Sequence, residues 1–276
     1  MARDHHPLSF PSLQRYGSTA LVTGASSGIG ACFVRVLAAS GFQTLILVAR
    51  REERLHSLKD ELERLYSCSC IPVAIDLSVP GACSRLAQII DEKQIVVDLV
   101  VNNAGFGLLG CVETIDSERC RQMVDLNCGA VVDLTRVFIA GMKARGRGAI
   151  IITSSVVGAL PTPWFSVYAA TKAFDLYFGE ALYAECRGSG VDILTVLPGL
   201  TETEFQAGMG EREYSVSART PEQVVSTACR SLGKKAIVVD GLLYKLLVHG
   251  SRFLPRCILL PLSRRIMQSQ IGSVVT

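Results

Sequence analysis

Short runs of apolar residues recur along this 276-residue chain and alternate with segments of helical periodicity. The runs cover residues 19–23, 44–49, 71–75, 96–101, 149–153, 191–197 and 236–239. Strands that alternate apolar and polar residues bury one face, whereas almost continuous apolar runs indicate strands buried on both faces. The pattern therefore predicts an α/β fold, a doubly wound parallel sheet of the Rossmann type with about seven strands and helices on both faces.

The most distinctive residues directly follow the predicted strands. In such sheets, ligands bind outside the carboxyl ends of the strands. Scattered structural glycines would have no reason to gather at one edge, so we expect a single ligand site there. From the first strand to the sixth, these residues are Gly24 to Gly30, Arg50, Asp76, Asn102 to Gly105, Ser155, and Pro198 with Gly199.

The turn after the first strand contains three glycines, Gly24, Gly28 and Gly30. They permit a tight turn and let a pyrophosphate approach the backbone N–H groups at the start of the next helix. Their spacing differs from the usual G-x-G-x-x-G. On this pattern alone, a plain turn between strand and helix stays open beside cofactor binding.

The end of the second strand discriminates between cofactors. An acidic residue there would bind a free ribose 2′-hydroxyl, whereas an arginine accommodates a 2′-phosphate. This chain has Arg50 followed by Arg51, which favours NADP(H) and leaves NAD(H) as the alternative. Both arginines could also simply begin a solvated charged helix. Asp76 could accept a hydrogen bond from an adenine amino group or could start the next loop.

One candidate acid/base centre lies further along the chain. Tyr168 and Lys172 are four residues apart and share one face if residues 169–186 form a helix. A phenol, with a pKa near ~10, exchanges protons poorly at neutral pH unless a positive charge stabilises the phenolate. Lys172 can supply that charge, and Ser155 at the preceding strand end can bring its hydroxyl beside the phenol. The pair alone is a weak signal, since such pairs also occur on exposed helix faces.

Composition narrows the function classes. The net charge is only +3 and no basic stripe is interleaved with aromatics, so no nucleic-acid partner is expected. The ten cysteines lie singly in apolar segments and the closest pair, Cys68 and Cys70, lacks metal-ligand spacing, which predicts buried reduced thiols and no metal site. Residues 1–17 carry no signal-peptide core, and no apolar run reaches the roughly 18 residues of a spanning helix, so we expect a cytoplasmic protein.

Together the motifs resemble the classical short-chain dehydrogenases/reductases, whose motif set this chain has in the usual order. The resemblance covers roughly residues 17–240. Two details, the segments 102–107 and 168–174, are similar to the DltE-like branch, whose members mostly lack an assigned substrate. The matching motifs are Thr23 to Gly30, Asn102 to Gly105, Asn127, Ser155, Tyr168-x-x-x-Lys172 and Pro198-Gly199.

The resemblance implies a role for each catalytic residue. Tyr168 would be the general acid/base, and Ser155 would hydrogen-bond the substrate oxygen as it takes on negative charge. Ser154 is the neighbouring alternative to Ser155. Lys172 would lower the pKa of Tyr168 and hold the nicotinamide ribose hydroxyls. Asn127 would keep a water in line with Lys172 to relay the proton to solvent.

The resemblance also implies the cofactor contacts. Thr203 would bind the nicotinamide carboxamide. Many relatives that prefer NADP also have a basic residue in the glycine loop, where this chain has serines, so the cofactor preference depends on the two arginines. The predicted cofactor-binding residues are Gly24, Ser26, Ser27, Gly28, Ile29, Gly30, Arg50, Arg51, Asp76, Leu77, Asn103, Ala104, Gly105, Tyr168, Lys172, Pro198, Gly199 and Thr203.

The chain divides into a polar tail (1–16), one dehydrogenase domain (17–240) with a helical substrate lid (200–220), and a C-terminal extension (241–276). The extension combines apolar and basic residues, so it could pack on the domain, on a partner or on a membrane surface. Lid and loop residues predict a mainly apolar substrate pocket. They are Phe205, Met209, Tyr214, Phe106, Leu108, Leu109, Val157, Trp164 and Phe165.

These observations predict an oxidoreductase that transfers a hydride between NADP(H) and a small-molecule carbonyl or secondary alcohol of lipophilic character. The alternative is a non-catalytic NADP(H)-binding sensor or scaffold, although such relatives typically lose the tyrosine or the lysine. An epimerase or dehydratase is less favoured, because the glycine loop and the chain length look classical. The helix that contains Tyr168 is apolar around much of its circumference, so we expect it to be buried on more than its sheet side. Because classical members of the family commonly pair at this helix, the resemblance implies a homodimer or homotetramer.

Overall fold

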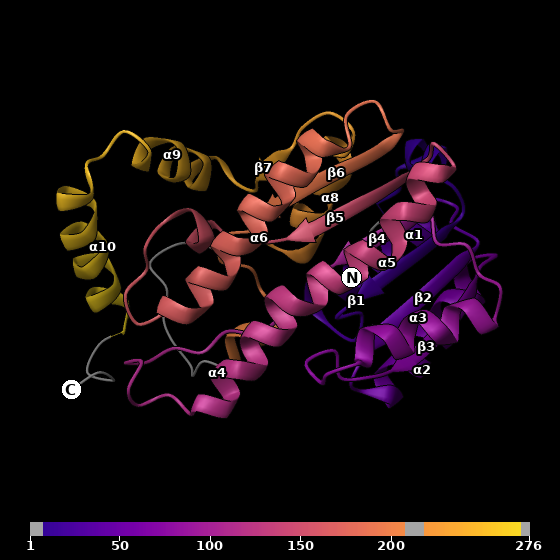
Figure 1. Cartoon of the computed structure of the whole chain (residues 1–276), viewed down its shortest axis with the longest axis horizontal. Helices are drawn as coiled ribbons and strands as arrows, with labels where there is room; N and C mark the ends of the chain where they lie inside the picture. The colour runs from indigo at the N-terminus through magenta and orange to yellow at the C-terminus, as the bar shows by residue number, and fades with distance from the viewer. Residues whose placement is uncertain (1–7, 208–217, 272–276) are drawn as a thin grey trace, which may run out of the picture.

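The structure is a computed structural model that describes residues 8–207 and 218–271. Seven parallel strands form one sheet in the order β3-β2-β1-β4-β5-β6-β7 (Figure 1). The order reverses between β1 and β4, which places a ligand crevice at their carboxyl ends. The predicted doubly wound, Rossmann-type sheet is confirmed. Its strands are β1 (Thr19–Thr23), β2 (Thr44–Ala49), β3 (Ser69–Ala74), β4 (Leu99–Asn102), β5 (Gly148–Thr153), β6 (Val191–Leu197) and β7 (Ile237–Val239).

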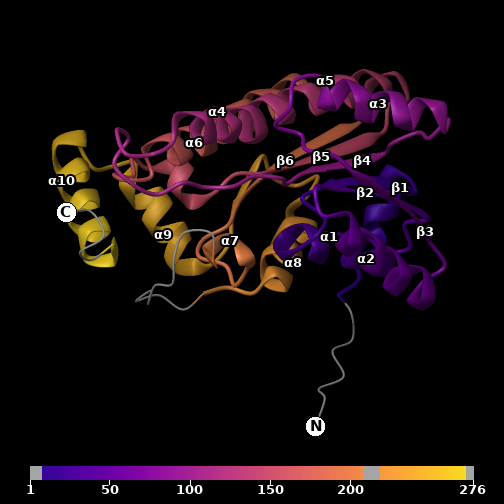
Figure 2. The same ribbon diagram turned by 90° about the horizontal axis from the view of Figure 1, so that it is seen from below.

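Helices cover both faces of the sheet (Figure 2). The strands send alternate residues into two separate cores, so that Ala20 and Val22 face one core and Leu21 faces the other. Both faces are therefore buried, which explains the continuous apolar runs. One face carries α1 (Gly28–Ala39), α2 (Glu52–Leu65) and α8 (Pro221–Ser231); the other carries α3 (Ala82–Glu92), α4 (Ser117–Val124), α5 (Ala130–Ala144) and α6 (Ser166–Glu185).

Residues 117–144 form one continuous helical region that contains a π-helical turn. Asp116 caps α4, its carboxylate accepting a hydrogen bond from the Arg119 N–H at 2.7 Å. A π-helical turn, η2 (Asp125–Gly129), then joins α4 to α5 and contains Asn127. Such turns occur mostly as single insertions in helices, often at functional sites. Two short 3₁₀ helices lie elsewhere in the chain: η1 (Pro11–Tyr16) precedes β1, and η3 (Val156–Ala159) follows β5.

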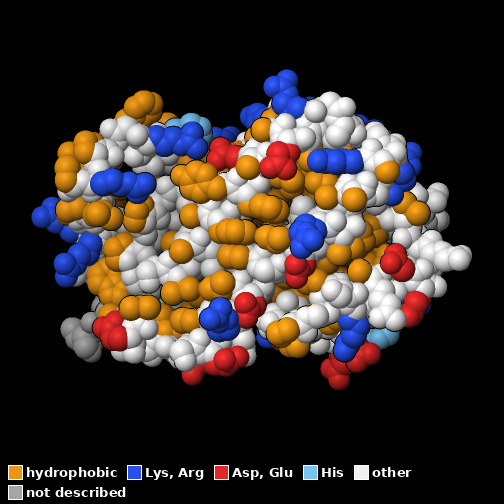
Figure 3. All heavy atoms as spheres, in the orientation of Figure 1, with side chains coloured by type: hydrophobic (Ala, Val, Ile, Leu, Met, Phe, Trp, Pro, Cys, Tyr) orange, Lys and Arg blue, Asp and Glu red, His pale blue; other side chains and the backbone are white. Residues whose placement is uncertain are grey.

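The short helix α7 (Glu204–Ala207) follows β6, whereas α9 (Leu242–Ser251) and α10 (Arg256–Ile271) follow β7 and lie at the left of Figure 1. Their inner side packs on the domain, since Val248 is buried and the Ser263 hydroxyl donates to the Pro161 carbonyl at 2.7 Å. None of the described helices is both long and apolar enough to span a bilayer. Both apolar and basic side chains are visible at the left of Figure 3. The exposed residues of α9, α10 and the turn between them include Leu242, Leu246, Phe253, Leu254, Ile258, Leu262 and Ile266, together with Lys245, Arg252, Arg256, Arg264 and Arg265.

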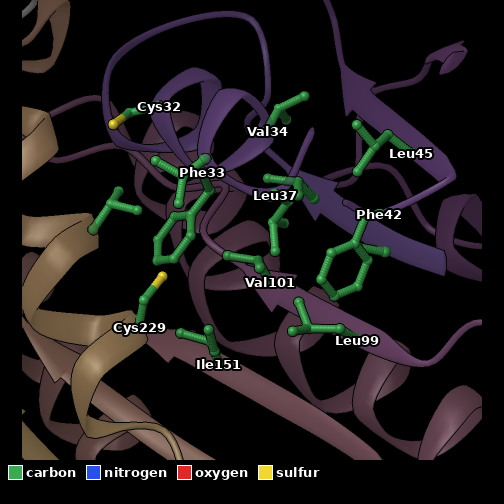
Figure 4. Close-up of a cluster of buried hydrophobic side chains, with 14 of the residues drawn as sticks. Cys32, Phe33, Val34, Leu37, Phe42, Leu45, Leu99, Val101, Ile151 and Cys229 are labelled. Atoms are coloured by element: carbon green, nitrogen blue, oxygen red, sulfur yellow. The ribbon is translucent and has the colours of Figure 1, made fainter. Parts of the chain in front are cut away.

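Phe33 is a fully buried centre of the core on the α1 side (Figure 4). It points from α1 toward Cys229 of α8 and toward the sheet residues Val101 and Ile151.

The cysteines of the chain are free, and Cys229 is among the buried ones. Within residues 8–207 and 218–271, no group of His, Cys, Asp or Glu side chains has the arrangement of a metal site.

Candidate active site

The carboxyl ends of the strands open into a cavity of about 570 Å³. Most residues predicted from the sequence line it, although they come from six different strand ends. Gly30 and Asn127 lie outside the lining. The predicted residues that do line the cavity are Gly24, Ser26, Ser27, Gly28, Ile29, Arg50, Arg51, Asp76, Leu77, Asn103, Ala104, Gly105, Ser155, Tyr168, Lys172, Pro198, Gly199 and Thr203.

Tyr168 lies in the first turn of α6 and is 8% exposed. Burial raises the pKa of the phenol, and the Lys172 charge and a hydrogen bond with Ser155 offset part of that rise. The Ser154 hydroxyl donates instead to the Lys172 backbone carbonyl at 2.6 Å, a hydrogen bond that connects the end of β5 to α6. Ser155 is therefore the serine that meets the phenol.

Lys172 is 5% exposed, and its ammonium has two partners. Nζ donates to the Thr153 carbonyl at 2.8 Å and to Oδ2 of Asp175 at 2.8 Å. Burial lowers the pKa of Lys172, but Asp175, Tyr168 and Cys128 together raise it by more, so the net pKa is raised. Our sequence reasoning missed Asp175. An aspartate three residues after the lysine in a largely apolar helix was the available signal.

Asn127 lies behind the cavity and is fully buried. Its Nδ2 donates to the Phe106 carbonyl and to the Thr171 hydroxyl, both at 3.0 Å, and its Oδ1 accepts the Phe106 N–H at 3.2 Å. The side chain thus clamps the loop after β4 to α6. Because both amide hydrogens are used, a water held here would have to donate to Oδ1 or to the backbone carbonyl. Gly105 is required at this point, since a Cβ would lie 2.9 Å from Oδ1 of Asn127.

The glycine turn after β1 is built for close approach. Gly24 and Gly28 have φ angles of +68° and +53°, which favour glycine. Gly30 acts in packing instead of lining the cavity, because a Cβ there would lie 2.2 Å from the Gly24 carbonyl oxygen. Asn103 supports the turn from β4, its side-chain amide donating to the Thr23 carbonyl at 3.0 Å.

A cluster of arginines lies at the end of the cavity beside the carboxyl end of β2. Arg51 donates to the hydroxyls of Ser26 at 3.0 Å and Ser27 at 2.7 Å, and also to the Glu204 carboxylate at 2.7 Å. Arg54 donates to the same carboxylate at 2.5 Å. Hydrogen bonds from these arginines lower the pKa of Glu204. The carboxylate occupies an anion site between two guanidinium groups. We did not predict Arg54 or Glu204, because the contact joins α2 to α7 across about 150 residues.

Arg50 and Asp76 face each other across the same end, with Nη1 of Arg50 3.7 Å from Oδ2 of Asp76. Oδ1 of Asp76 accepts hydrogen bonds from the Ser78 N–H at 3.0 Å and the Ser78 hydroxyl at 2.7 Å. Burial raises the pKa of Asp76, but these bonds and Arg50 lower it overall. An acceptor with a lowered pKa therefore follows β3, and its bonds to Ser78 also shape the start of the next loop.

The opposite end of the cavity is apolar. The ring of Phe205 on α7 lies 5.5 Å from the Tyr168 ring, and Phe165 lies 5.8 Å from it on another side. Phe106, Leu108 and Val157 also line this end. Leu109 and Trp164 do not line the cavity, whereas Met209 and Tyr214 lie outside the described residues. The lining residues that we did not predict include Leu200, Tyr244 and Met267, the last two from α9 and α10.

Comparisons with known proteins agree with this geometry. A family model described as short chain dehydrogenase matches residues 18–214. A short chain dehydrogenase of Pseudocercospora fijiensis is 37% identical over 70% of this chain, which spans only 63% of that protein's length. A 7beta-hydroxysteroid dehydrogenase of Collinsella aerofaciens is 31% identical over 86% of this chain and 90% of its own. The structure of a short-chain dehydrogenase from Sphingobium yanoikuyae in complex with NADPH superposes with a TM-score of 0.74 at 28% identity, covering 94% of this chain and 98% of that one.

The family model spans most of the chain, and its limits enclose the glycine turn, Asn127, Ser155 and the Tyr168–Lys172 pair. The seven-stranded sheet and the cavity at its carboxyl edge agree with this family match. The chain therefore belongs to the short-chain dehydrogenase/reductase family, as an oxidoreductase that acts on a carbonyl or CH–OH group.

Proposed function

We propose that the chain is an NADP(H)-dependent carbonyl reductase for lipophilic ketones or aldehydes, with Tyr168 as its general acid/base. The observation that carries the proposal is the position of the buried phenol, between Ser155 and Lys172 on one side and a wall of aromatic residues on the other. A bound nicotinamide cofactor would supply the hydride for reduction.

The protein's part is control of the proton. As the carbonyl oxygen gains negative charge, Tyr168 donates its phenolic proton to that oxygen and Ser155 donates a hydrogen bond to it. Lys172 stabilises the phenolate that is left behind. Oxidation of an alcohol is the reverse, with the phenolate taking the proton. Asn127 holds the loop that carries Gly105 and Phe106 against α6, and we propose that it also retains a water for proton return.

The arginine cluster supports NADP(H) over NAD(H). A carboxylate already lies between Arg51 and Arg54, which shows that an anion fits there, and a 2′-phosphate would be bound by the same guanidinium groups. Ser26 and Ser27 would add hydroxyl donors in place of the basic loop residue of other members. The structural relative from Sphingobium yanoikuyae, which was solved with NADPH, is consistent with this preference.

Arg51→Ala tests the cofactor preference. We expect weaker NADPH binding by roughly tenfold and unchanged NADH binding, since one charge-assisted contact to the phosphate is lost. Calorimetric titration measures both affinities. Arg64→Ala, an exposed arginine on α2, is the matched control. An equal loss for both cofactors would show that Arg51 does not contact a 2′-phosphate.

The apolar end of the cavity supports a lipophilic substrate. Its lining side chains include Phe106, Leu108, Val157, Phe165 and Phe205, and a related protein is a 7beta-hydroxysteroid dehydrogenase. We therefore propose a bulky ketone, and a 7-oxo steroid belongs in the first substrate panel. Tyr244 and Met267 of the extension line the cavity, which supports a catalytic domain at residues 17–240 whose pocket is partly formed by α9 and α10.

Tyr168→Phe tests the central proposal. With NADPH and the panel of lipophilic ketones and aldehydes, we expect turnover by the wild type and a loss of at least about a hundredfold in the variant. NADPH should still raise the melting temperature of both proteins. NADPH binding without any turnover in the wild type would favour the alternative, a non-catalytic sensor.

We also propose a homodimer or homotetramer that pairs through α5 and α6. Tyr177 is 70% exposed there, and Phe174 and Val137 are also exposed. Tyr177→Glu would place a charge in this interface, so we expect a lower mass by light scattering, whereas Glu185→Gln on the same helix should keep the wild-type mass.

The exposed surface of α9 and α10 is a second candidate interaction surface. We propose that it contacts an anionic membrane, and vesicle flotation tests this. A cytoplasmic location is likewise a proposal.

A further inference from the structure

Asp175 is a buried acid that the mechanism above does not use. It lies one helical turn after Lys172 on α6, is 0% exposed, and accepts a hydrogen bond from the Lys172 ammonium at 2.8 Å. Its second oxygen, Oδ1, has no hydrogen-bond partner among the described residues. Buried ion pairs are often no more stabilising than apolar side chains of similar volume. Fold stability alone therefore does not explain an aspartate at this position.

Few charged or titratable groups surround the Lys172–Asp175 pair. On α6 the other such group is Tyr168, and β5 contributes only the neutral carbonyl of Thr153. The π-helical turn contributes Cys128, whose pKa is raised by burial, and further by Asp175, to about 12. The thiol is therefore neutral at working pH. Burial raises the pKa of Asp175, and the charge of Lys172 and its hydrogen bond offset part of that rise. Among the described residues, Asp175 is the carboxyl group paired with Lys172, so its carboxylate form would balance the ammonium charge.

The pair also fixes the direction of the ammonium group. Two of its three N–H bonds are used by Asp175 and Thr153, which leaves one donor. Gly105 leaves space beside Nζ, since a Cβ there would be 3.6 Å from it. Because Gly105 lines the cavity, the remaining donor has room on the cofactor side.

We propose that Asp175 is a positioning residue that acts through Lys172, keeping the buried acid/base centre electrically neutral while Tyr168 holds its proton. The inference deepens the proposed function of Tyr168 and depends on it. With Asp175 ionised, Tyr168, Lys172 and Asp175 sum to zero charge, and loss of a proton leaves a buried net charge of −1. If the carboxylate is removed, loss of one proton changes the net charge of the centre from +1 to zero. The first proton is then lost at lower pH, whether it leaves the tyrosine or the lysine.

The consequence is a bias toward reduction, because Tyr168 stays a proton donor to higher pH. Tyr168 and Asp175 are seven residues apart, about 10 Å along the helix axis. With an effective dielectric constant of about 20, removing a charge at that distance shifts the first proton loss by about one pH unit.

Asp175→Asn removes the charge and preserves the shape, whereas Asp175→Glu retains the charge. Asp175→Leu is a second neutral variant in case the amide destabilises the fold, and Glu185→Gln is an exposed control on the same helix. Two readouts follow the acid/base centre. One is the alkaline limb of the pH profile of kcat/KM for NADPH-dependent reduction of a panel ketone. The other needs no substrate: the NMR signal of Tyr168 in protein with isotope-labelled tyrosine, assigned by its loss in Tyr168→Phe.

We expect both midpoints to move down by about one pH unit in Asp175→Asn and Asp175→Leu, and to stay within a few tenths in the other two variants. Unchanged midpoints in both neutral variants would overturn the inference. The inference would also be overturned if the NMR signal of the Asp175 carboxyl group in the wild-type protein showed that the group is protonated at neutral pH. This test requires no substitution. If the NMR midpoint shifts while no ketone is reduced, the role of Asp175 stands and the proposed reductase fails.

Discussion

Glu204 makes a testable link between the lid and the cofactor preference. Its carboxylate bridges Arg51 at 2.7 Å and Arg54 at 2.5 Å, so it competes for the guanidinium groups that would bind a 2′-phosphate. All three side chains are between 43% and 50% exposed, and exposed ion pairs contribute only about 0.5 kcal/mol each because solvent screens them. Glu204→Gln would therefore remove about 1 kcal/mol of competition. This corresponds to NADPH binding that is tighter by about fivefold.

Isothermal titration calorimetry at constant, low salt measures this effect. NADH affinity should stay unchanged, because NADH has no 2′-phosphate, and the NADPH gain should shrink as salt rises. Glu202→Gln, at an exposed position two residues before Glu204, is the matched control. Equal gains for NADH and NADPH, or weaker NADPH binding in Glu204→Gln, would refute the competition between carboxylate and phosphate.

Two further predictions concern stability. Asp240 is buried and pairs with Arg219 at 2.8 Å; burial raises the pKa of Asp240, but Arg219 lowers it overall. A depressed folded pKa contributes stability above the unfolded value of about 3.9, and that stability is lost as pH falls through the folded pKa. Asp240→Asn should thus cost about 2 kcal/mol in urea unfolding at pH 7 and progressively less in acid; a cost independent of pH would contradict this. Phe33→Ala should cost about 3–5 kcal/mol by leaving a cavity, whereas Phe253→Ala, at an exposed position, should stay within about 0.5 kcal/mol; equal costs would show that Phe33 is not a packed core residue.

Much of the fold could be predicted because it depends on local patterns. An apolar run such as residues 191–197 can bury both faces only inside a covered parallel sheet, and β6 is such a strand. The ends of these strands necessarily meet at one edge, so residues as distant as Gly24 and Ser155 could be assigned to one site before any contact was known. The spacing of Tyr168 and Lys172 likewise predicted a shared helix face.

The sequence alone determined the strands, the family and the candidate acid/base pair, since each is encoded in short-range spacing. Only the tertiary structure decided which side chains are partners. Glu204 meets Arg51 because the chain after β6 returns to the end of β2. Asn127 is a clamp instead of an open amide because a π-helical turn aims it at Phe106. Such contacts depend on how elements distant in sequence pack in three dimensions, and no local pattern of residues records that arrangement.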